Sequence, residues 1–194
     1  MERVCIFVDG SNLHHGLKKQ KKDPTFWIDY HKLFRELLEK RELMQIYYYS
    51  APLDRTHYGE DSYRGQQKFF ANLKRNSKLT LKLGRLEKRI TSGVTTFVEK
   101  GVDVNIAVDM ISLAYDNRYD TAILVSGDGD FASAIAAVQK HNKIVEVAST
   151  PARKAYHLQQ VCNRFVSIDQ SMLDKCGRNT TSSTVITTTK LPAE

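Results

Sequence analysis

Two aspartates, Asp128 and Asp130, stand two residues apart directly after an apolar run in the segment "LVSGDGDF" (124–131). A carboxylate resists burial, so a pair at the end of a buried strand needs solvent, a turn or a ligand. Asp9 ends an earlier apolar run, "RVCIFVD", and Asp103 lies at the start of "VDVNIAVDMISLAYD". Three separate segments of the chain therefore each carry a carboxylate beside an apolar element.

Carboxylates that lie close together suggest a cation. Like charges within a few ångströms repel strongly at low dielectric and raise each other's pKa unless a cation lies among them. Hard oxygen ligands suit Mg²⁺ or Mn²⁺. Such an ion polarises a phosphoryl oxygen and activates a water molecule for in-line attack. We therefore expect a divalent metal held by Asp9, Asp103 and Asp128.

Each acid also has a simpler structural explanation. Asp103 can cap its helix, and the other three lie in sequence that forms turns readily. A helical wheel puts Asp103 on the apolar side of its helix and Asp109 in a solvated stripe with the polar residues Asn105, Ser112 and Asp116. Other chemistry finds less support, because the histidines lack metal-binding spacing and "SGDGDF" is not a dinucleotide-binding motif.

Apolar runs alternate with amphipathic segments along the chain. The runs typical of buried strands are 3–9, 43–51, 120–127, 143–149 and 164–169. The segments typical of helices are 11–20, 28–41, 58–76, 102–116, 131–142 and 152–161. Residues 79–100 predict a strand and then a hairpin that turns at Ser92-Gly93. This order predicts an α/β fold with three α/β/α layers, a mostly parallel central sheet and a β-hairpin insertion. Ligands bind beyond the carboxyl ends of such strands, where the acids would meet.

The charge balance favours an anionic partner. The 194 residues carry a net charge of +7, and residues 64–90 hold nine Lys or Arg against one acid, Glu87. Phosphate backbones are bound mainly by such cations, so Arg85 and Lys88 are candidates for RNA contacts, although a basic segment is often only a solvated face. Three widely spaced cysteines suggest a reducing, cytoplasmic location, and no apolar stretch reaches the ~18 residues of a membrane span.

Three blocks of sequence, "IFVDGSNL", "EKGVDVNIAVDMI" and "AILVSGDGDFASAI", carry a family resemblance. They resemble the signature blocks of the NYN domain in its LabA-like branch. The resemblance implies a PIN-like fold and a metal-dependent ribonuclease site. By position it implies that Asp9, Asp103 and Asp128 bind metal, with Asp130 as a further acid and Asp109 as a further ligand. It also implies contacts to RNA from Asn12, Lys100 and Ser126.

We therefore expect an NYN domain over 1–170 and a flexible tail over 171–194. The predicted function is Mg²⁺- or Mn²⁺-dependent hydrolysis of RNA, with Asp9, Asp103, Asp128 and Asp130 as the catalytic acids. The expected partner is single-stranded RNA, no membrane is involved, and a homodimer remains open. A non-catalytic RNA-binding regulator is the alternative, and a phosphatase acting on small phosphate esters is a third reading.

Overall fold

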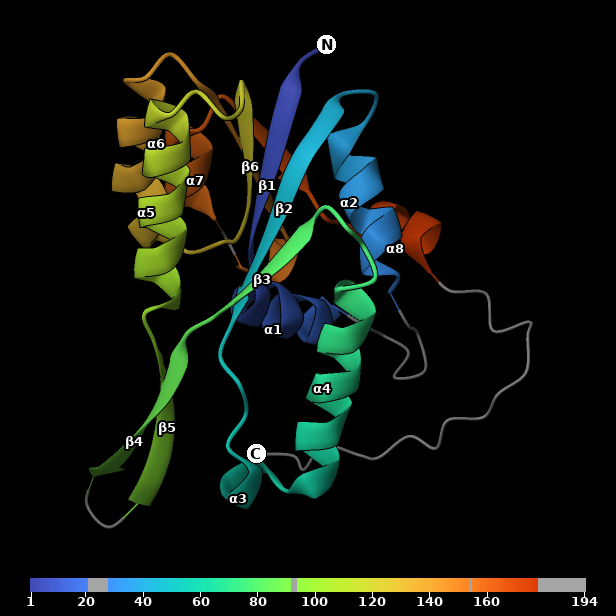
Figure 1. Ribbon diagram of the computed structural model, residues 1–194, viewed down its shortest axis with the longest axis vertical. Helices are drawn as coiled ribbons and strands as arrows, with labels where there is room; N and C mark the ends of the chain where they lie inside the picture. The colour runs from blue at the N-terminus through green and yellow to red at the C-terminus, as the bar shows by residue number, and fades with distance from the viewer. Residues whose placement is uncertain (21–27, 92–93, 154, 178–194) are drawn as a thin grey trace.

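The centre of the fold is a six-stranded parallel sheet with the strand order β3-β2-β1-β6-β7-β8 (Figure 1). The computed structural model describes residues 1–20, 28–91, 94–153 and 155–177. Its sheet strands are β1 (Arg3–Asp9), β2 (Glu42–Ser50), β3 (Leu79–Leu83), β6 (Thr121–Val125), β7 (Ile144–Ser149) and β8 (Arg164–Ser167). The predicted strands are thus all present, and the mostly parallel sheet is confirmed.

Helices cover both faces of this sheet. One face carries α5 (Val102–Tyr115), α6 (Ala132–Gln139) and α7 (Tyr156–Val161), and the other carries α1 (Gly10–Gln20), α2 (Tyr30–Leu38) and α8 (Gln170–Cys176) (Figure 1). The side chains of β1 alternate between two cores. Ile6 and Val8 pack toward α1 and α2, whereas Cys5 and Phe7 pack toward α5 and α6. Burial on both faces explains why the central strands β1 and β6 are apolar along most of their length, and it confirms the three-layer architecture.

The single helix predicted over 58–76 is two helices, α3 (Arg55–Tyr58) and α4 (Glu60–Leu73). Asp54 caps α3 by accepting a hydrogen bond from the backbone N of His57 at 2.8 Å. Gly59 then adopts a φ of 80°, which ends α3 and redirects the chain into α4. Similarly, the helix predicted over 152–161 is a 3₁₀ turn, η2 (Pro151–Arg153), followed by α7.

The predicted hairpin is formed by β4 (Arg85–Thr91) and β5 (Val94–Lys100), which pair antiparallel. It extends away from the sheet at one end of the molecule, beyond the point where β3 ends (Figure 1). Its predicted turn, Ser92-Gly93, lies outside the described residues. Gly84 joins β3 to β4 and packs closely against the last residue of β5. A Cβ there would lie 2.7 Å from the carbonyl oxygen of Lys100 and 2.8 Å from Val102 Cγ2.

The order of strands in the sheet creates a switch point between β1 and β6. From β1 the chain builds outward through β2 and β3, and it then returns to β6 and builds in the opposite direction through β7 and β8. β1 and β6 are direct neighbours, with Val8 opposite Val125. The crevice beyond the carboxyl ends of two such strands is where open α/β sheets bind ligands.

The fold continues through α8, within the segment 171–194 that was predicted to be a flexible tail. Asp169 caps α8 through the backbone N of Met172 at 3.0 Å, and Leu173 and Cys176 are buried in the core that also holds α2. Residues 178–194 lie outside the described residues, so for them the tail stays a prediction. None of the helices formed by the described residues is long and apolar enough to cross a membrane.

Gly84→Ala should lower the free energy of unfolding by about 1–3 kcal/mol. The added methyl group would overlap the carbonyl oxygen of Lys100, and relieving this overlap requires the backbone to move. Gly65→Ala is the matched control. Gly65 lies within α4 with nothing within 4 Å of an added Cβ, so alanine there should stabilise the protein by about 0.5–1 kcal/mol. Urea denaturation measures both, and equal stability of Gly84→Ala and wild type would contradict this account of the hairpin base.

Candidate active site

Asp9 is a buried acid at the carboxyl end of β1. The residue is 4% exposed, and its two carboxylate oxygens accept different hydrogen bonds. Oδ1 accepts from the backbone N of Asn12 at 2.9 Å, and Oδ2 accepts from Ser126 Oγ at 3.0 Å. Burial raises the pKa of Asp9 to about 6, the two hydrogen bonds oppose this rise, and the negative charges of Asp103 and Asp128 add to it.

Ser126 and Asn12 tie the chain after β6 to the chain after β1. Ser126, 2% exposed, donates to Asp9, and its Oγ also accepts from the backbone N of Asp128 at 3.2 Å. Asn12 Oδ1 accepts from the backbone N of Gly127 at 3.0 Å. Asn12 and Ser126, which were both predicted to contact RNA, therefore hold the loop after β1 and the loop after β6 together.

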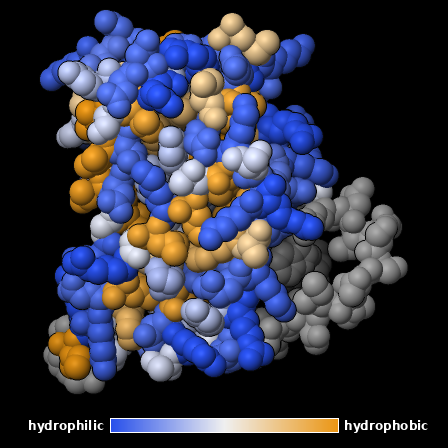
Figure 2. Space-filling model, viewed as in Figure 1, coloured by the Kyte–Doolittle hydropathy of each residue, from blue (hydrophilic) through white to orange (hydrophobic). Residues whose placement is uncertain are grey.

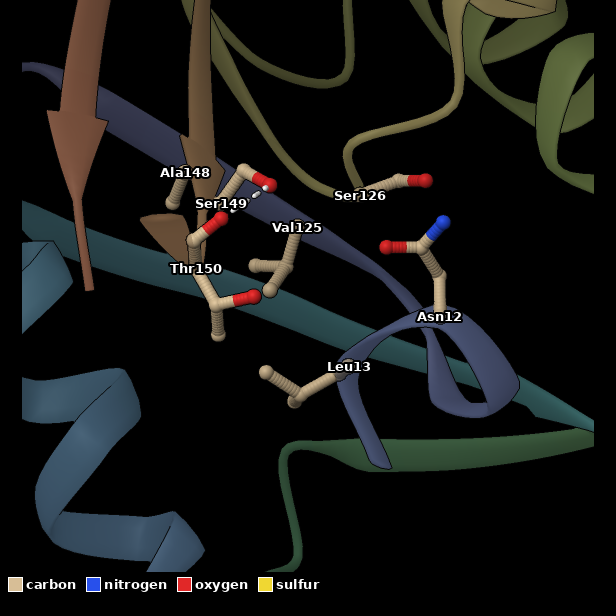
Figure 3. Close-up of a pocket in the computed structure, with 7 residues that line it drawn as sticks. All are labelled: Asn12, Leu13, Val125, Ser126, Ala148, Ser149 and Thr150. Atoms are coloured by element: carbon tan, nitrogen blue, oxygen red, sulfur yellow. Dashed lines mark hydrogen bonds between the residues drawn. The ribbon is translucent and has the colours of Figure 1, made fainter. Parts of the chain in front are cut away.

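A small polar pocket lies behind Asn12 and Ser126 and reaches Ser149 and Thr150 at the end of β7 (Figure 3). Figure 3 shows the side chains of Asn12 and Ser126 beside each other at one end of this pocket. The pocket has no space for a water molecule. It is therefore part of the packing that supports the site and is too small to hold a ligand.

A separate, open cleft lies at the switch point and is lined by Asp9. It encloses about 190 Å³, and its lining combines acids, polar groups and one arginine: Asp9, Ser11, Asn12, Glu99, Val102, Asp103, Asp128 and Arg153. The three acids predicted to bind metal are thus brought together from β1, the first turn of α5 and the loop after β6. Desolvation, followed by the charges of Asp128 and Asp130, raises the pKa of Asp103.

Asp128 and Asp130 have different places. Asp128 lines the cleft and also caps the 3₁₀ turn η1 (Gly129–Phe131), because its Oδ1 accepts from the backbone N of Asp130 at 3.1 Å. Asp128 therefore faces the cleft and caps the turn at the same time. Asp130 is exposed and does not line the cleft, although its charge acts on Asp103.

Asp103 and Asp109 differ from the helical-wheel prediction. Asp103 is exposed, because the first turn of α5 lies beside the cleft where no core covers it. Asp109, predicted to lie in a solvated stripe, is instead half-buried against β2 and β3. Its Oδ2 accepts from Tyr49 Oη at 2.5 Å and lies 2.6 Å from Lys82 Nζ. Asp109 is absent from the cleft lining, so the structure does not bring this predicted ligand to the other acids.

Glu99 and Arg153 are lining residues that the sequence analysis missed. Burial raises the pKa of Glu99, a hydrogen bond from Ser11 opposes the rise, and the charges of Asp9 and Asp103 add to it. Among the described residues, Glu99 Oε1 and Arg153 Nε are buried atoms with no hydrogen-bond partner. A Cβ on Gly127 would lie 2.5 Å from Arg153 Cβ, so this glycine lets η2 approach the acidic loop. The signal for Glu99 was its place in the quoted block "EKGVDV", whereas Arg153 lies in no recognised motif.

The predicted basic contacts lie on the hairpin outside the cleft lining. Arg85 and Lys100 are cross-strand partners at its base, and Lys88 lies opposite Phe97 farther along. Arg85 and Lys88 are exposed. Of the remaining cations of 64–90, Arg89 lies on β4, where it pairs with Glu87. The others are spread over α4, the following turn and β3, where Lys82 is paired with Asp109. The basic segment is therefore not one continuous face.

The cleft suits a hydrated divalent cation. In the part of the chain that the structure describes, no three His, Cys, Asp or Glu side chains are arranged to hold a metal directly. Mg²⁺, however, keeps several of its waters and is commonly held by only one or two carboxylates. An unpartnered oxygen of Glu99 and the mutually repelling acids supply a hard, oxygen-rich donor set in a space that admits water.

Comparisons with known proteins point to one family. The NYN domain model matches residues 3–169. The low amplitude and bright protein LabA of Synechococcus elongatus is 26% identical over 180 residues, which cover 91% of this chain and 90% of LabA. A crystal structure of a Vibrio parahaemolyticus protein of unknown function superimposes with a TM-score of 0.68 at 25% identity, covering 91% of this chain and 96% of that one. Both likenesses extend over 91% of the chain, and the NYN domain match at 3–169 includes all three acidic segments.

In the metal-free protein, Asp9→Asn should raise the free energy of unfolding at pH 8. The pKa of Asp9 rises from 3.8 to about 6 on folding, so the folded state favours the protonated form. The contribution of Asp9 to the free energy of unfolding is therefore fully present below about pH 4. It is lost as the pH rises through about 6, and the loss amounts to about 3 kcal/mol. The stabilisation by asparagine should therefore disappear near pH 4, as measured by urea denaturation in EDTA.

Asp120→Asn is the control of opposite sign. The hydrogen bonds from Arg3 lower the pKa of Asp120 to about 2, so this carboxylate stabilises the fold above its unfolded pKa. Its replacement should destabilise the protein at pH 8. If Asp9→Asn is also less stable than wild type at pH 8, then the negative charge of Asp9 does not lower the free energy of unfolding, and the prediction is wrong.

Proposed function

The chain belongs to the NYN domain family, and we propose that it hydrolyses phosphodiester bonds of RNA in its acidic cleft with Mg²⁺ or Mn²⁺. The NYN domain is a nuclease-type domain of the PIN-like kind, and NYN domain proteins bind RNA. The observation that carries the proposal is the meeting of Asp9, Asp103 and Asp128 in one cleft at the switch point of the sheet. Asp9 and Asp128 also accept hydrogen bonds that hold their loops, but these local roles do not explain why Asp103 joins them in the same cleft.

In this proposal, Asp9, Asp103 and Asp128 would hold the cation. When bound, the divalent ion would polarise the phosphoryl oxygen and lower the pKa of a water molecule. Asp9 is kept in place by Asn12 N and Ser126 Oγ, so its carboxylate needs little reorganisation to act. Glu99, whose pKa is raised, is placed to accept a proton within the cleft. Arg153 would bind a non-bridging phosphate oxygen, because this residue lines the same space.

The test is cleavage of single-stranded RNA by the purified protein with Mn²⁺. Asp128→Asn should reduce the rate more than about 100-fold, because the loss of groups that only support a metal ligand already costs about 10–100-fold. Asp116→Asn is the matched control, since Asp116 is an exposed acid at the far end of α5. Chelation by EDTA should abolish cleavage by wild type and control alike. Cleavage by Asp128→Asn at the wild-type rate would refute the assignment.

A non-catalytic RNA-binding protein is the second candidate, favoured by one observation. The exposed cations of the hairpin lie outside the cleft, where they would serve binding without hydrolysis. Strongly salt-dependent RNA binding without metal binding and without cleavage would identify this function. Hydrolysis of a phenyl phosphate without cleavage of RNA would instead identify a phosphatase.

The proposal takes single-stranded RNA as the substrate, because the exposed cations of the hairpin beside the acidic cleft suit one extended strand. It takes the cytoplasm as the location. The three cysteines, Cys5, Cys162 and Cys176, are free thiols, two of them buried, which accords with a reducing compartment. The homodimer stays a prediction without a supporting contact.

A further inference from the structure

The β4–β5 hairpin presents one face that leads directly out of the acidic cleft. In its antiparallel register, Glu99 lies opposite Leu86 and Phe97 lies opposite Lys88. Directly opposite residues share a face, as do residues two apart along a strand. Glu99, Phe97 and Lys88 therefore lie on the same face. Because Glu99 lines the cleft, Phe97 is about 7 Å farther out along the strand.

Two aromatic rings of α3 meet Phe97 on this path. The His57 ring lies 4.4 Å from the Phe97 ring, tilted by 36°, and the Tyr58 ring lies 4.7 Å from His57 and 6.2 Å from Phe97. Both His57 and Tyr58 are exposed, whereas Phe97 is half-buried. The cap by Asp54 fixes the turn that carries them. We call these three residues the aromatic step.

The charges around the aromatic step suit a phosphate backbone. Lys88 is exposed and forms no ion pair with any described residue, so its ammonium group is available to an anion. Arg85 lies at the hairpin base, exposed on the opposite face. Side chains over the hairpin, at the lower left of the view, are largely hydrophilic (Figure 2). An aromatic ring beside free cations is the arrangement by which proteins hold single-stranded nucleic acids without reading their sequence.

We propose that the aromatic step is a base-stacking subsite for the nucleotide next to the phosphate in the acidic cleft. The inference rests on the proposed function in taking the cleft as the place of that phosphate. The base stacks on the exposed rings of His57 and Tyr58, and Lys88 binds the backbone beyond it. Packing alone would explain why Phe97 meets α3. It does not require an exposed histidine and tyrosine beside a lysine that forms no ion pair with any acid of the described residues.

The test measures binding of a short labelled oligouridine by fluorescence anisotropy in EDTA, so that cleavage plays no part. His57→Ala and Phe97→Leu should each weaken binding by roughly 5- to 100-fold, the range expected for one stacked base. His57→Tyr, which keeps a ring, should bind as wild type does. Tyr115→Ala is the matched control and should also bind normally. Tyr115 is 76% exposed, touches the ring of His141 and lies at the opposite end of α5 from the cleft.

A second experiment tests whether His57 stacks on a base or only stabilises the hairpin. It uses a series of oligonucleotides, each with one abasic residue at a different position. Wild type should lose affinity when one particular base is absent, and His57→Ala should be insensitive to that same loss. All variants should bind inorganic polyphosphate, which has charge but no bases, equally well. Unchanged RNA binding by His57→Ala, or an equal loss for intact RNA and polyphosphate, would overturn the proposal.

Failure of the aromatic step and failure of the proposed hydrolysis give different results. If wild type binds RNA with this base dependence yet cleaves none, hydrolysis fails and the subsite stands. If wild type cleaves RNA while His57→Ala and Phe97→Leu bind it as tightly as wild type, the subsite fails and hydrolysis stands.

Discussion

Asp9 is 4% exposed, and it shares a cleft with Asp103, Asp128 and Glu99. Burying one charge among others of the same sign costs free energy, and the raised pKa of Asp9 expresses that cost. The surrounding chain is organised to hold this arrangement. Two hydrogen bonds fix the Asp9 carboxylate. Ser126, which donates one of them, also accepts a hydrogen bond from the backbone N of Asp128 and so connects Asp9 to that loop. A divalent cation in the cleft would relieve the repulsion that the fold otherwise bears.

The sheet topology explains why these acids meet. β1 and β6 are neighbours although more than a hundred residues separate them, because the chain completes one half of the sheet before it begins the other. The loops after both strands therefore open into one crevice. The hairpin supplies a further acid to this crevice, Glu99 of β5. Gly84 holds its base against Lys100 and Val102, and this contact sets Glu99 beside the acids from the sheet.

Much of the fold and part of the site followed from the sequence. Apolar runs identified β1, β2, β6, β7 and β8, whereas β3 and the hairpin strands β4 and β5 were predicted from alternating apolar and polar residues. Asp9 and Asp128 could be placed because each follows such a run directly. Asp109 could not, since α5 is apolar around much of its surface, with Val104 and Val108 exposed, and a wheel then defines its buried side poorly. The block "EKGVDV" contained Glu99 but did not place its side chain, because that place depends on the hairpin register. Arg153 reaches the cleft through loop packing, which no local pattern encodes.

The central claim is that the acidic cleft holds a divalent cation, and diffraction tests it most directly. Crystals grown with Mn²⁺ should give an anomalous peak at the manganese edge inside the cleft. That peak should lie within bonding distance of a carboxylate oxygen of Asp9, Asp103 or Asp128, with waters completing the coordination. An empty cleft in crystals that bind Mn²⁺ only at exposed acids elsewhere, such as Asp116, would contradict the account.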